Sequence, residues 1–336
     1  MIFLYYAGLC SDLQTEQIGL AISSDGKKFE RVNNNGLVLP INRSSNWMSC
    51  MTCNPAVMKI NEEKFIMFFQ GIVKNPRKTT IGLSESLNGI DWKSHHPIIS
   101  LDDKNISLPL EAEKYSTKDL IEPTVIYDEG IFKMWFISRG DNEVNNRLHY
   151  AESKNVKSWQ IKKTDILKNK IAPNFLIFYP EVIKTGNRKY SLFLTLRDKF
   201  RFKHSICEYT SQNGLEFNFK KKILPNFFDI KRIDFANLIK IPKVRGVVAT
   251  LVEYSLKKIS PRDYYGYSHS CHYNFNNDKR LVYHSYHYDS QNKFYMDIGS
   301  FDVNSKNHNN KQTILSVNFN KDEWDAGTVA DPFILK

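Results

Sequence analysis

Short runs of apolar residues follow one another along the whole chain, and their length and spacing predict β-strands. Phe, Tyr, Ile and Val are common in these runs, and such side chains suit the half-buried face of a sheet. One set of predicted strands covers residues 2–7, 65–70, 132–137, 190–195 and 247–252. A second set follows the first four of these strands, at 18–23, 80–84, 148–152 and 204–209.

A short polar motif closes each strand of the second set: Ser, any residue, Asp or Asn, then Gly, with an aromatic residue three positions later. Asp or Asn followed by Gly tolerates positive φ, which a tight turn between twisted strands requires. We interpret the motif as a structural hairpin turn with no catalytic role. Its copies begin at Ser23, Ser86, Ser153 and Ser211, with Val156 in the Gly position of the third copy and a shortened fifth copy at 290–294.

A third set of predicted strands precedes the others and opens with a polar or aromatic residue that is usually followed by Pro. Pro is acceptable at the first residue of a strand, where the ladder needs no donor. The openings are Asn54-Pro55, Glu122-Pro123, Tyr179-Pro180, residues 235–239 and Asp331-Pro332. Because the chain starts on a strand of one set and ends on a strand of another, we expect its two ends to pair in one sheet and remove the open edge.

Four strands in each unit of about sixty residues predict an all-β fold, a five-bladed β-propeller with four-stranded antiparallel blades. The paired N- and C-terminal strands close the ring within one blade. We expect residues 1–336 to form a single domain and 264–275 to be an added hairpin in the last blade. The predicted blades cover 329–336 with 1–40, then 50–100, 118–165, 175–225 and 230–303.

Composition allows one large β-domain, since 41% of the 336 residues are hydrophobic and 13% are aromatic. No run approaches the roughly 20 apolar residues of a membrane span, so we expect no transmembrane segment. The apolar start of the chain lacks the basic region and cleavage site of a signal peptide, and we expect a cytoplasmic protein. The five cysteines are too sparse for a disulfide framework. We interpret the lone pair Cys50 and Cys53 as thiols without a metal or redox role.

The formal charge of +11 is spread along the chain. A nucleic-acid partner would require a coherent basic stripe or a recognition motif, and neither is present. The charge is compatible with a solvated basic surface, or with an anionic small ligand, an acidic glycan or a membrane headgroup surface.

Several motifs together resemble the arabinanase, levansucrase and invertase superfamily of five-bladed propellers, which are enzymes similar to glycoside hydrolase families 43 and 32. They are Tyr5-Tyr6-Ala7-Gly8 with residues 18–26, Glu122-Pro123 with Lys133-Met134-Trp135-Phe136, and Ala330-Asp331-Pro332-Phe333. The likeness covers nearly the whole chain as a repeat pattern. It implies a carbohydrate or sugar-phosphate ligand bound in a central funnel.

The resemblance also implies catalytic roles for the residues that open the inner strands. Asp331 would be the base or nucleophile and Glu122 the general acid, while Asn54 stands where the family has a supporting Asp. Two carboxyl groups on either side of a sugar are what glycoside cleavage requires, and Glu122 would need a raised pKa to hold its proton. Asn54 carries no negative charge, which leaves a non-catalytic propeller open.

Further residues are expected near the funnel. Arg139 and Arg197 end second strands at its mouth, where a guanidinium can fork onto a carboxylate or phosphate. Glu181 could supply the charge missing at Asn54, and Tyr179 and Gln70 complete the expected substrate-binding set. We expect His269, His272, His284 and His287 to pack in the sheet or lie on the surface rather than bind a metal. The sequence specifies no cofactor, although some members of the superfamily bind calcium.

The sequence therefore favours a carbohydrate-active enzyme that cleaves or transfers a glycosidic bond, with an acidic or phosphorylated sugar as one option. Two alternatives remain: a non-catalytic propeller that binds a glycan or a partner, and a glycoside phosphorylase in which arginines hold phosphate.

Overall fold

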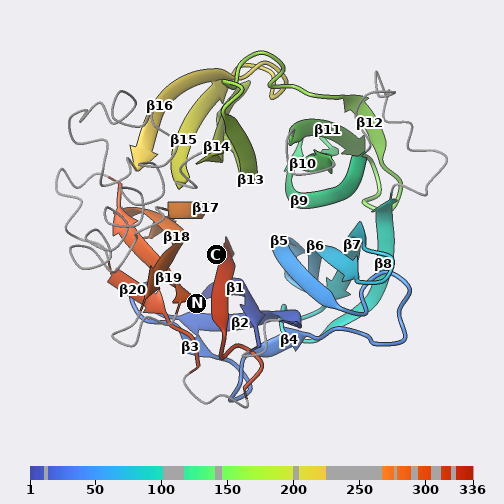
Figure 1. Cartoon of the computed structure of the whole chain (residues 1–336), viewed down its shortest axis with the longest axis vertical. Coiled ribbons are helices and arrows are strands. Elements are labelled where there is room, and N and C mark those ends of the chain that lie inside the picture. The colour runs from blue at the N-terminus through green and yellow to red at the C-terminus, as the bar shows by residue number, and fades with distance from the viewer. Residues whose placement is uncertain are drawn as a thin grey trace, which may run out of the picture.

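The computed structural model describes residues 1–10, 14–100, 117–140, 146–199, 204–224, 267–275, 278–288, 294–303, 312–318 and 323–335. All regular elements in these ranges are β-strands. The sheets form a ring around a central axis, and one strand of each group lies nearest the centre (Figure 1). Across the same ranges, no helix is long and apolar enough to cross a membrane.

The first part of the ring contains two groups of strands. In the first group β21 pairs with β1 and β1 pairs with β2, whose outer side pairs with β3 and β4. In the second group β5, β6, β7 and β8 pair in chain order. The bounds are β21 (Thr328–Leu335), β1 (Ile2–Leu9), β2 (Glu16–Ser23), β3 (Glu30–Arg31), β4 (Leu37–Leu39), β5 (Met51–Asn61), β6 (Lys64–Val73), β7 (Lys78–Ser86) and β8 (Trp92–Ser100).

One parallel pair, Glu16 opposite Met51, joins these two groups into a nine-stranded sheet. The rest of the ring consists of three four-stranded antiparallel sheets. They contain β9 (Thr117–Asp128), β10 (Ile131–Gly140), β11 (Arg147–Ser153) and β12 (Gln160–Lys163); β13 (Phe175–Gly186), β14 (Lys189–Asp198), β15 (His204–Ser211) and β16 (Asn218–Leu224); and β17 (Tyr267–Phe275), β18 (Asp278–Tyr288), β19 (Phe294–Asp302) and β20 (Gln312–Leu315).

The two ends of the chain pair as the sequence predicted. β1 runs antiparallel to β21, with Tyr5 opposite Phe333 and Ala7 opposite Ala330. The predicted strands around 65–70, 132–137 and 190–195 are the central parts of β6, β10 and β14, and those at 80–84, 148–152 and 204–209 lie in β7, β11 and β15. The prediction of an all-β ring of antiparallel sheets is therefore confirmed.

The last sheet corrects one prediction. Residues 264–275 were expected to be an added hairpin, but Tyr267–Phe275 forms β17, which pairs with β18 as the inner strand of its four-stranded sheet. The strands expected at 235–239 and 247–252 lie outside the described residues. The sequence pattern failed here because His269 is followed by Ser rather than by the Pro that marks the other inner strands.

The repeated Ser motif forms the hairpin turns that the sequence predicted. In the copy at Ser86, the hydroxyl oxygen accepts the N–H of Gly89 (2.9 Å), and Asn88 Oδ1 accepts the N–H of Ile90 (2.9 Å). The residue in the Gly position has a positive φ in all four described copies, including Val156 at 60°. The shortened copy at 290–294 lies mostly outside the described residues.

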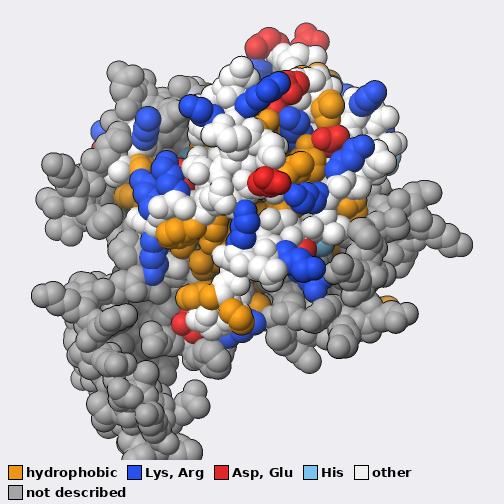
Figure 2. All heavy atoms as spheres, turned by 90° about the horizontal axis from the view of Figure 1, so that it is seen from above, with side chains coloured by type: hydrophobic (Ala, Val, Ile, Leu, Met, Phe, Trp, Pro, Cys, Tyr) orange, Lys and Arg blue, Asp and Glu red, His pale blue; other side chains and the backbone are white. Residues whose placement is uncertain are grey.

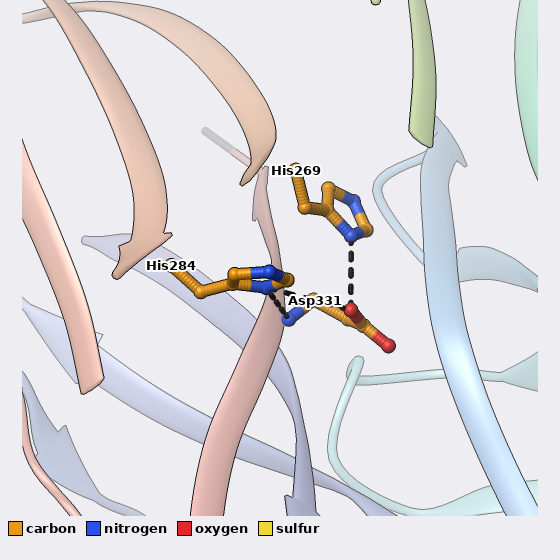
Figure 3. A group of neighbouring side chains, drawn as sticks. All are labelled: His269, His284 and Asp331. Carbon is orange, nitrogen blue, oxygen red and sulfur yellow. Dashed lines mark hydrogen bonds and ion pairs between the residues drawn. The ribbon is translucent and has the colours of Figure 1, made fainter. Parts of the chain in front are cut away.

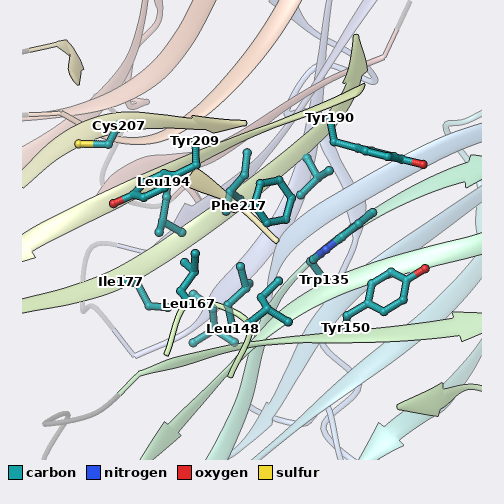
Figure 4. Close-up of a cluster of buried hydrophobic side chains, with 14 of the residues drawn as sticks. Trp135, Leu148, Tyr150, Leu167, Ile177, Tyr190, Leu194, Cys207, Tyr209 and Phe217 are labelled. Atoms are coloured by element: carbon teal, nitrogen blue, oxygen red, sulfur yellow. The ribbon is translucent and has the colours of Figure 1, made fainter. Parts of the chain in front are cut away.

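These turns also tie neighbouring sheets together. The carbonyl oxygen of Gly89 accepts the hydroxyl of Tyr5 (2.7 Å), which lies in the preceding group of strands. In the same way, Gly214 accepts the indole N–H of Trp135 (2.8 Å). Around Trp135 the two sheets share a buried core of apolar side chains (Figure 4), including Leu148, Tyr150, Ile177, Tyr190, Leu194 and Phe217.

The basic residues were expected to be spread out along the chain. On the face shown in Figure 2, the Lys and Arg side chains of the described residues lie scattered among polar and apolar ones instead of forming one stripe.

The turn glycines give a first prediction. Gly214 has φ +73°, and a Cβ there would lie 3.0 Å from the Trp135 ring, whereas Gly130 has φ +79° and nothing within 4 Å. We expect Gly214→Ala to lower the free energy of unfolding by about 2–3 kcal/mol, because it adds steric conflict to left-handed strain of roughly 1–2 kcal/mol. Gly130→Ala is the matched control, and its free energy of unfolding should fall only by the cost of the left-handed strain. Urea unfolding followed by Trp fluorescence measures both, and equal losses would show that the contact with Trp135 contributes nothing.

Candidate active site

The inner strands share a distortion, which in all of them except β17 lies at the residue that the sequence expected to open the strand. In β5, β9, β13, β17 and β21, one non-glycine residue adopts a left-handed backbone, and the pairing with the next strand shifts register there. Such a backbone costs of order 1–3 kcal/mol per residue, and strain of this kind clusters at functional sites. The residues are Asn54 (φ 52°), Glu122 (57°), Tyr179 (51°), His269 (46°) and Asp331 (50°).

Four of these residues, Asn54, Glu122, Tyr179 and Asp331, line a cavity of about 220 Å³ on the axis. Its polar wall also contains Glu16, Gln70, Arg77, Arg139 and His284. Further along the same strands, a second cavity of about 20 Å³ is lined by the prolines that follow and by Glu181 and His269. The second cavity has room for about one water molecule, so only the first can hold a small organic ligand.

Glu122 is buried in the wall of the 220 Å³ cavity, which from here on is called the axial cavity. Its Oε2 accepts the backbone N–H of Tyr179 (2.6 Å), and its side chain is 6% exposed. Burial and the nearby charge of Asp331 raise the pKa of Glu122 to about 8, although the Tyr179 N–H and the Arg139 charge oppose the change. Glu122 therefore carries a proton at neutral pH, as a general acid must.

Asp331 has the opposite protonation because it is surrounded by donors. His269 Nδ1 lies 3.1 Å from its Oδ1 (Figure 3). Burial alone would raise the pKa of Asp331, but the bond with His269 and the backbone N–H of Asn54 outweigh burial and lower it. Asp331 is therefore ionised at neutral pH, while Glu122 in the same cavity is not.

Two histidines hold Asp331 in place. His284 Nδ1 accepts the backbone N–H of Asp331 (3.2 Å), and burial lowers the pKa of His284 to about 3, so this ring is neutral. The His269 ring stacks on Tyr179, with centroids 4.6 Å apart, and its backbone N–H donates to Thr195 Oγ1 (3.0 Å). These two histidines were expected only to pack in the sheet or lie on the surface, but both contact Asp331.

Asn54 and Gln70 contact each other on the neighbouring wall. Asn54 Nδ2 donates to Gln70 Oε1 (2.9 Å), and both side chains are buried. The other amide atom, Asn54 Oδ1, is buried and accepts no hydrogen bond from the described residues. The wall therefore presents an acceptor in the place where a carboxylate was expected from the resemblance.

The two arginines expected at the funnel mouth have different positions. Arg139 lines the axial cavity and donates to the Asp119 carboxylate through Nε (2.8 Å) and Nη2. Arg197 is not part of the described cavity wall, and its guanidinium lies over the Phe178 ring, 5.9 Å from the centroid. A third arginine, Arg77, also lines the cavity with its Nε 3.7 Å from Asp119. Its place in the β6–β7 hairpin gave no sequence signal.

Glu181 does not supply the charge missing at Asn54. Its carboxylate accepts the backbone N–H of His272 (2.6 Å) and pairs with the His272 Nδ1 (2.6 Å), beside the small second cavity. This prediction was wrong because Glu181 lies two residues after the left-handed position and faces away from the axial cavity. Tyr179 lines both cavities. The side chain of His287 lies outside the described residues.

Glu16 is the acidic residue that the sequence analysis missed. It lies at the start of β2, before the predicted strand, and lines the axial cavity beside Asp331 and Cys53. The acidic oxygens of Glu16 and Asp331 and the Cys53 sulfur all lie within 4.8 Å of one another. No local motif indicates this role, because the cluster depends on three separate strands.

Within the described residues, two groups of donor atoms are compact enough for a metal ion. One contains His269, His284 and Asp331, and the other Glu16, Cys53 and Asp331. Both share Asp331, and in the first the His284 Nδ1 lone pair already accepts a backbone N–H. A cation bound to that nitrogen would require the His284 ring to turn, so the geometry favours positioning of Asp331 over coordination.

The comparisons with known proteins agree with this fold. No protein-family model and no curated protein sequence matches the chain. Similar solved structures include a BT0996 RGII complex (13% identity over 91% of this protein and 85% of that one, TM-score 0.61). Another is a putative glycoside hydrolase from Parabacteroides distasonis (16% identity over 92% of this protein and 89% of that one, TM-score 0.54). A third is a GH130 structure (14% identity over 92% of this protein and 84% of that one, TM-score 0.52). That family of mannoside phosphorylases is said to contain glycoside hydrolases that target beta-1,2 mannosidic linkages in Candida mannan.

The fold is therefore that of propeller-type glycoside hydrolases, and the resemblance noted in the sequence is confirmed at that level. At these identities the likeness shows the fold alone, so the chemistry must be argued from the site.

His284 gives a prediction about pH. Its pKa is about 6.5 in the unfolded chain and about 3 in the folded protein. Between these values the unfolded state binds one more proton, so the stability falls as the pH drops from 6.5 towards 3, by up to about 1.4 kcal/mol per pH unit. His284→Asn keeps an acceptor for the Asp331 N–H but does not titrate. Thermal unfolding from about pH 7 to about pH 4 should show a shallower decline for this variant, and identical slopes would contradict a neutral buried His284.

Proposed function

We propose that the protein is a five-bladed propeller enzyme that cleaves or transfers a glycosidic bond, with Glu122 as general acid and Asp331 as base or nucleophile. The observation on which this rests is that two buried carboxyl groups of one cavity have pKa values displaced in opposite directions. Pairs of titratable groups with such different environments mark acid and base roles. The five inner strands with the same left-handed residue support the blade number.

The two carboxyl groups can divide the reaction between them. Glu122 Oε2 is occupied by the Tyr179 N–H, which leaves Oε1 to hold the proton and pass it to the leaving oxygen. Asp331 is held ionised, and can either accept a proton from water or attack the anomeric carbon. The leaving group departs with the Glu122 proton, so the charge is balanced at the end of the step.

The size of the cavity favours a small substrate portion. At about 220 Å³, it is below the roughly 300–1,000 Å³ of common ligand pockets. We therefore propose that the described cavity holds one terminal sugar unit of its substrate. Tyr179, Gln70 and the Asn54 amide would contact this sugar.

Arg77 and Arg139 favour an acidic or phosphorylated sugar. Both line the axial cavity, and both guanidinium groups face a single carboxylate, that of Asp119. Each guanidinium group is a positive charge on the cavity wall, and Arg can bind a substrate anion in a fork. The same pair favours the second candidate function, a glycoside phosphorylase in which inorganic phosphate takes the place of water. The cytoplasmic location expected from the sequence stays a prediction.

The catalytic roles predict a loss of turnover in two variants, only one of which an acidic leaving group should rescue. We expect Glu122→Gln and Asp331→Asn each to reduce turnover by about a hundredfold or more, as loss of general acid–base catalysis does. Aryl glycosides with acidic leaving groups should rescue Glu122→Gln but not Asp331→Asn, because such leaving groups need no proton. Activity of the wild type should fall above about pH 8, where Glu122 loses its proton.

The measurement is turnover of a panel of glycosides and phosphorylated sugars, with and without inorganic phosphate. Glu85→Gln is a matched control, since Glu85 lies on β7 and pairs with Lys64 away from the cavity. A folded wild type that turns over no substrate, or folded variants as active as the wild type, would show that the pair is not catalytic. A non-catalytic glycan-binding propeller would then be the better explanation.

The arginines give a separate prediction about specificity. Arg77→Gln should raise KM for acidic or phosphorylated substrates by about tenfold and leave KM for neutral analogues within about twofold, because one charge-assisted hydrogen bond to the substrate anion is lost. Steady-state kinetics on matched neutral and anionic glycosides measures the difference. Equal changes for both substrates would mean that Arg77 only supports the Asp119 network.

A further inference from the structure

Glu16 is held at the boundary between two groups of strands by long-range pairing. Within the described residues it forms the parallel pair with Met51, which links the sheet of β1 and β2 to that of β5. This pairing places the Glu16 side chain on the wall of the axial cavity that Asn54 and Asp331 also form. The residue also pairs with Leu9 across the β1–β2 hairpin, so the hairpin and the contact between the two groups of strands together fix its position.

The immediate neighbours of Glu16 determine where its proton lies. Two carboxyl groups this close inside a cavity do not readily carry charge at the same time. Asp331 has strong donors, His269 Nδ1 and the Asn54 backbone N–H, whereas Glu16 has the thiol of Cys53. The charge therefore stays on Asp331 and the proton on Glu16.

The electrostatic balance agrees with this assignment. Burial and the Asp331 charge raise the pKa of Glu16 to about 8, against the bond from Cys53, and burial keeps Cys53 a thiol. The other titratable or charged residues on the axial cavity wall are Glu122, Arg77, Arg139, Tyr179 and His284. His284 is neutral and Glu122 is protonated at neutral pH, while the two arginines are bound to Asp119.

A buried acceptor belongs to the same cavity wall, on Asn54. Asn54 is 7% exposed, and its Nδ2 is used by Gln70 and approaches the Cys53 sulfur (3.5 Å). Its Oδ1 accepts no hydrogen bond from the described part of the chain. The Cys53 side chain thus contacts both the Glu16 carboxyl and the Asn54 amide. A buried acceptor without a partner costs about 1–3 kcal/mol, which a ligand that donates to it would recover.

We propose that Glu16, carrying its proton, and the Asn54 carbonyl oxygen form a binding subsite for one hydroxyl of the sugar, next to Asp331. A hydroxyl group both donates and accepts, so it can accept the Glu16 proton in a hydrogen bond and donate to Asn54 Oδ1 at the same time. No proton is transferred, and Glu16 acts as a positioning residue. This subsite rests on the proposed function, because it assumes a sugar in the axial cavity.

The subsite also explains why Asn54 and not Asp stands at this position. A carboxylate there would add a second negative charge beside Asp331 and would draw the proton of Glu16 to itself. The amide supplies an acceptor without a charge, so that Asp331 remains the anion on this side of the sugar.

The first test needs no substrate. The pKa of Glu16 is about 4.5 in the unfolded chain and about 8 in the folded protein, so the folded state binds more protons between these values. Stability of the wild type is thus lost as pH rises through this window, and Glu16→Gln removes that loss. We expect the difference in melting temperature between Glu16→Gln and the wild type to increase from about pH 5 to about pH 8.5. In an Asp331→Asn background, the difference that Glu16→Gln makes should increase less. Glu85→Gln is the matched control, and a gain that is independent of pH would overturn the protonated state.

The second test measures binding instead of turnover. Methyl glycosides of common sugars and their monodeoxy analogues are titrated into the wild type, Glu16→Gln and Glu16→Leu by calorimetry at neutral pH. For the sugar that binds, removing one hydroxyl should weaken binding to the wild type about tenfold or more, because a buried polar pair is left unsatisfied. Glu16→Gln should retain this preference, since its amide still donates, and Glu16→Leu should lose it.

The outcomes separate the subsite from the proposed reaction. If parent and deoxy sugars bind the wild type equally, or if no parent glycoside binds, the hydroxyl subsite is wrong whatever the turnover assays show. If the wild type prefers the parent glycoside to its deoxy analogue, but Glu122→Gln and Asp331→Asn cause no loss of turnover, the subsite is supported and the proposed catalytic roles are wrong. The wild-type comparison alone decides the point if Glu16→Leu does not fold.

Discussion

The left-handed residue inside each inner strand is the constraint on which the rest of the site depends. A left-handed backbone turns the N–H away from the ladder of its own sheet and lets it reach a neighbouring strand. The N–H of Tyr179 bonds to Glu122, that of His269 to Thr195, and that of Asp331 to His284. The strain of a left-handed backbone is offset by hydrogen bonds between buried partners, which are strongest where one partner is charged.

The same bonds distribute the protons around the axis. Glu122 receives one backbone donor and remains protonated, whereas Asp331 receives His269 and the Asn54 N–H and remains charged. Glu16 has a thiol as its donor and keeps its proton. The difference between the acids thus follows from the number and strength of the donors that neighbouring strands bring to each.

Part of the site follows from local pattern and part does not. The repeated pattern predicted Asn54, Glu122 and Asp331 at the axis, although each lies inside its inner strand and does not open it. The prediction for Glu181 was wrong because the left-handed residue Tyr179 changes the face of the strand from which the following side chains project. Glu16 and Arg77 could not be found, because neither belongs to the repeated pattern and each reaches the cavity only through contacts between distant strands.

The sequence by itself determined the strands, their order and the hairpin turns, because alternating apolar positions and Gly turns act over a few neighbouring residues. It also determined that the two ends would meet in one sheet. Only the tertiary structure decided that β17 is an inner strand, that Glu181 pairs with His272, and that Glu16 and Cys53 lie beside Asp331. The physical reason is that these relations, and the protonation they impose, depend on desolvation and hydrogen bonds between residues far apart in the chain, which exist only once the ring is closed.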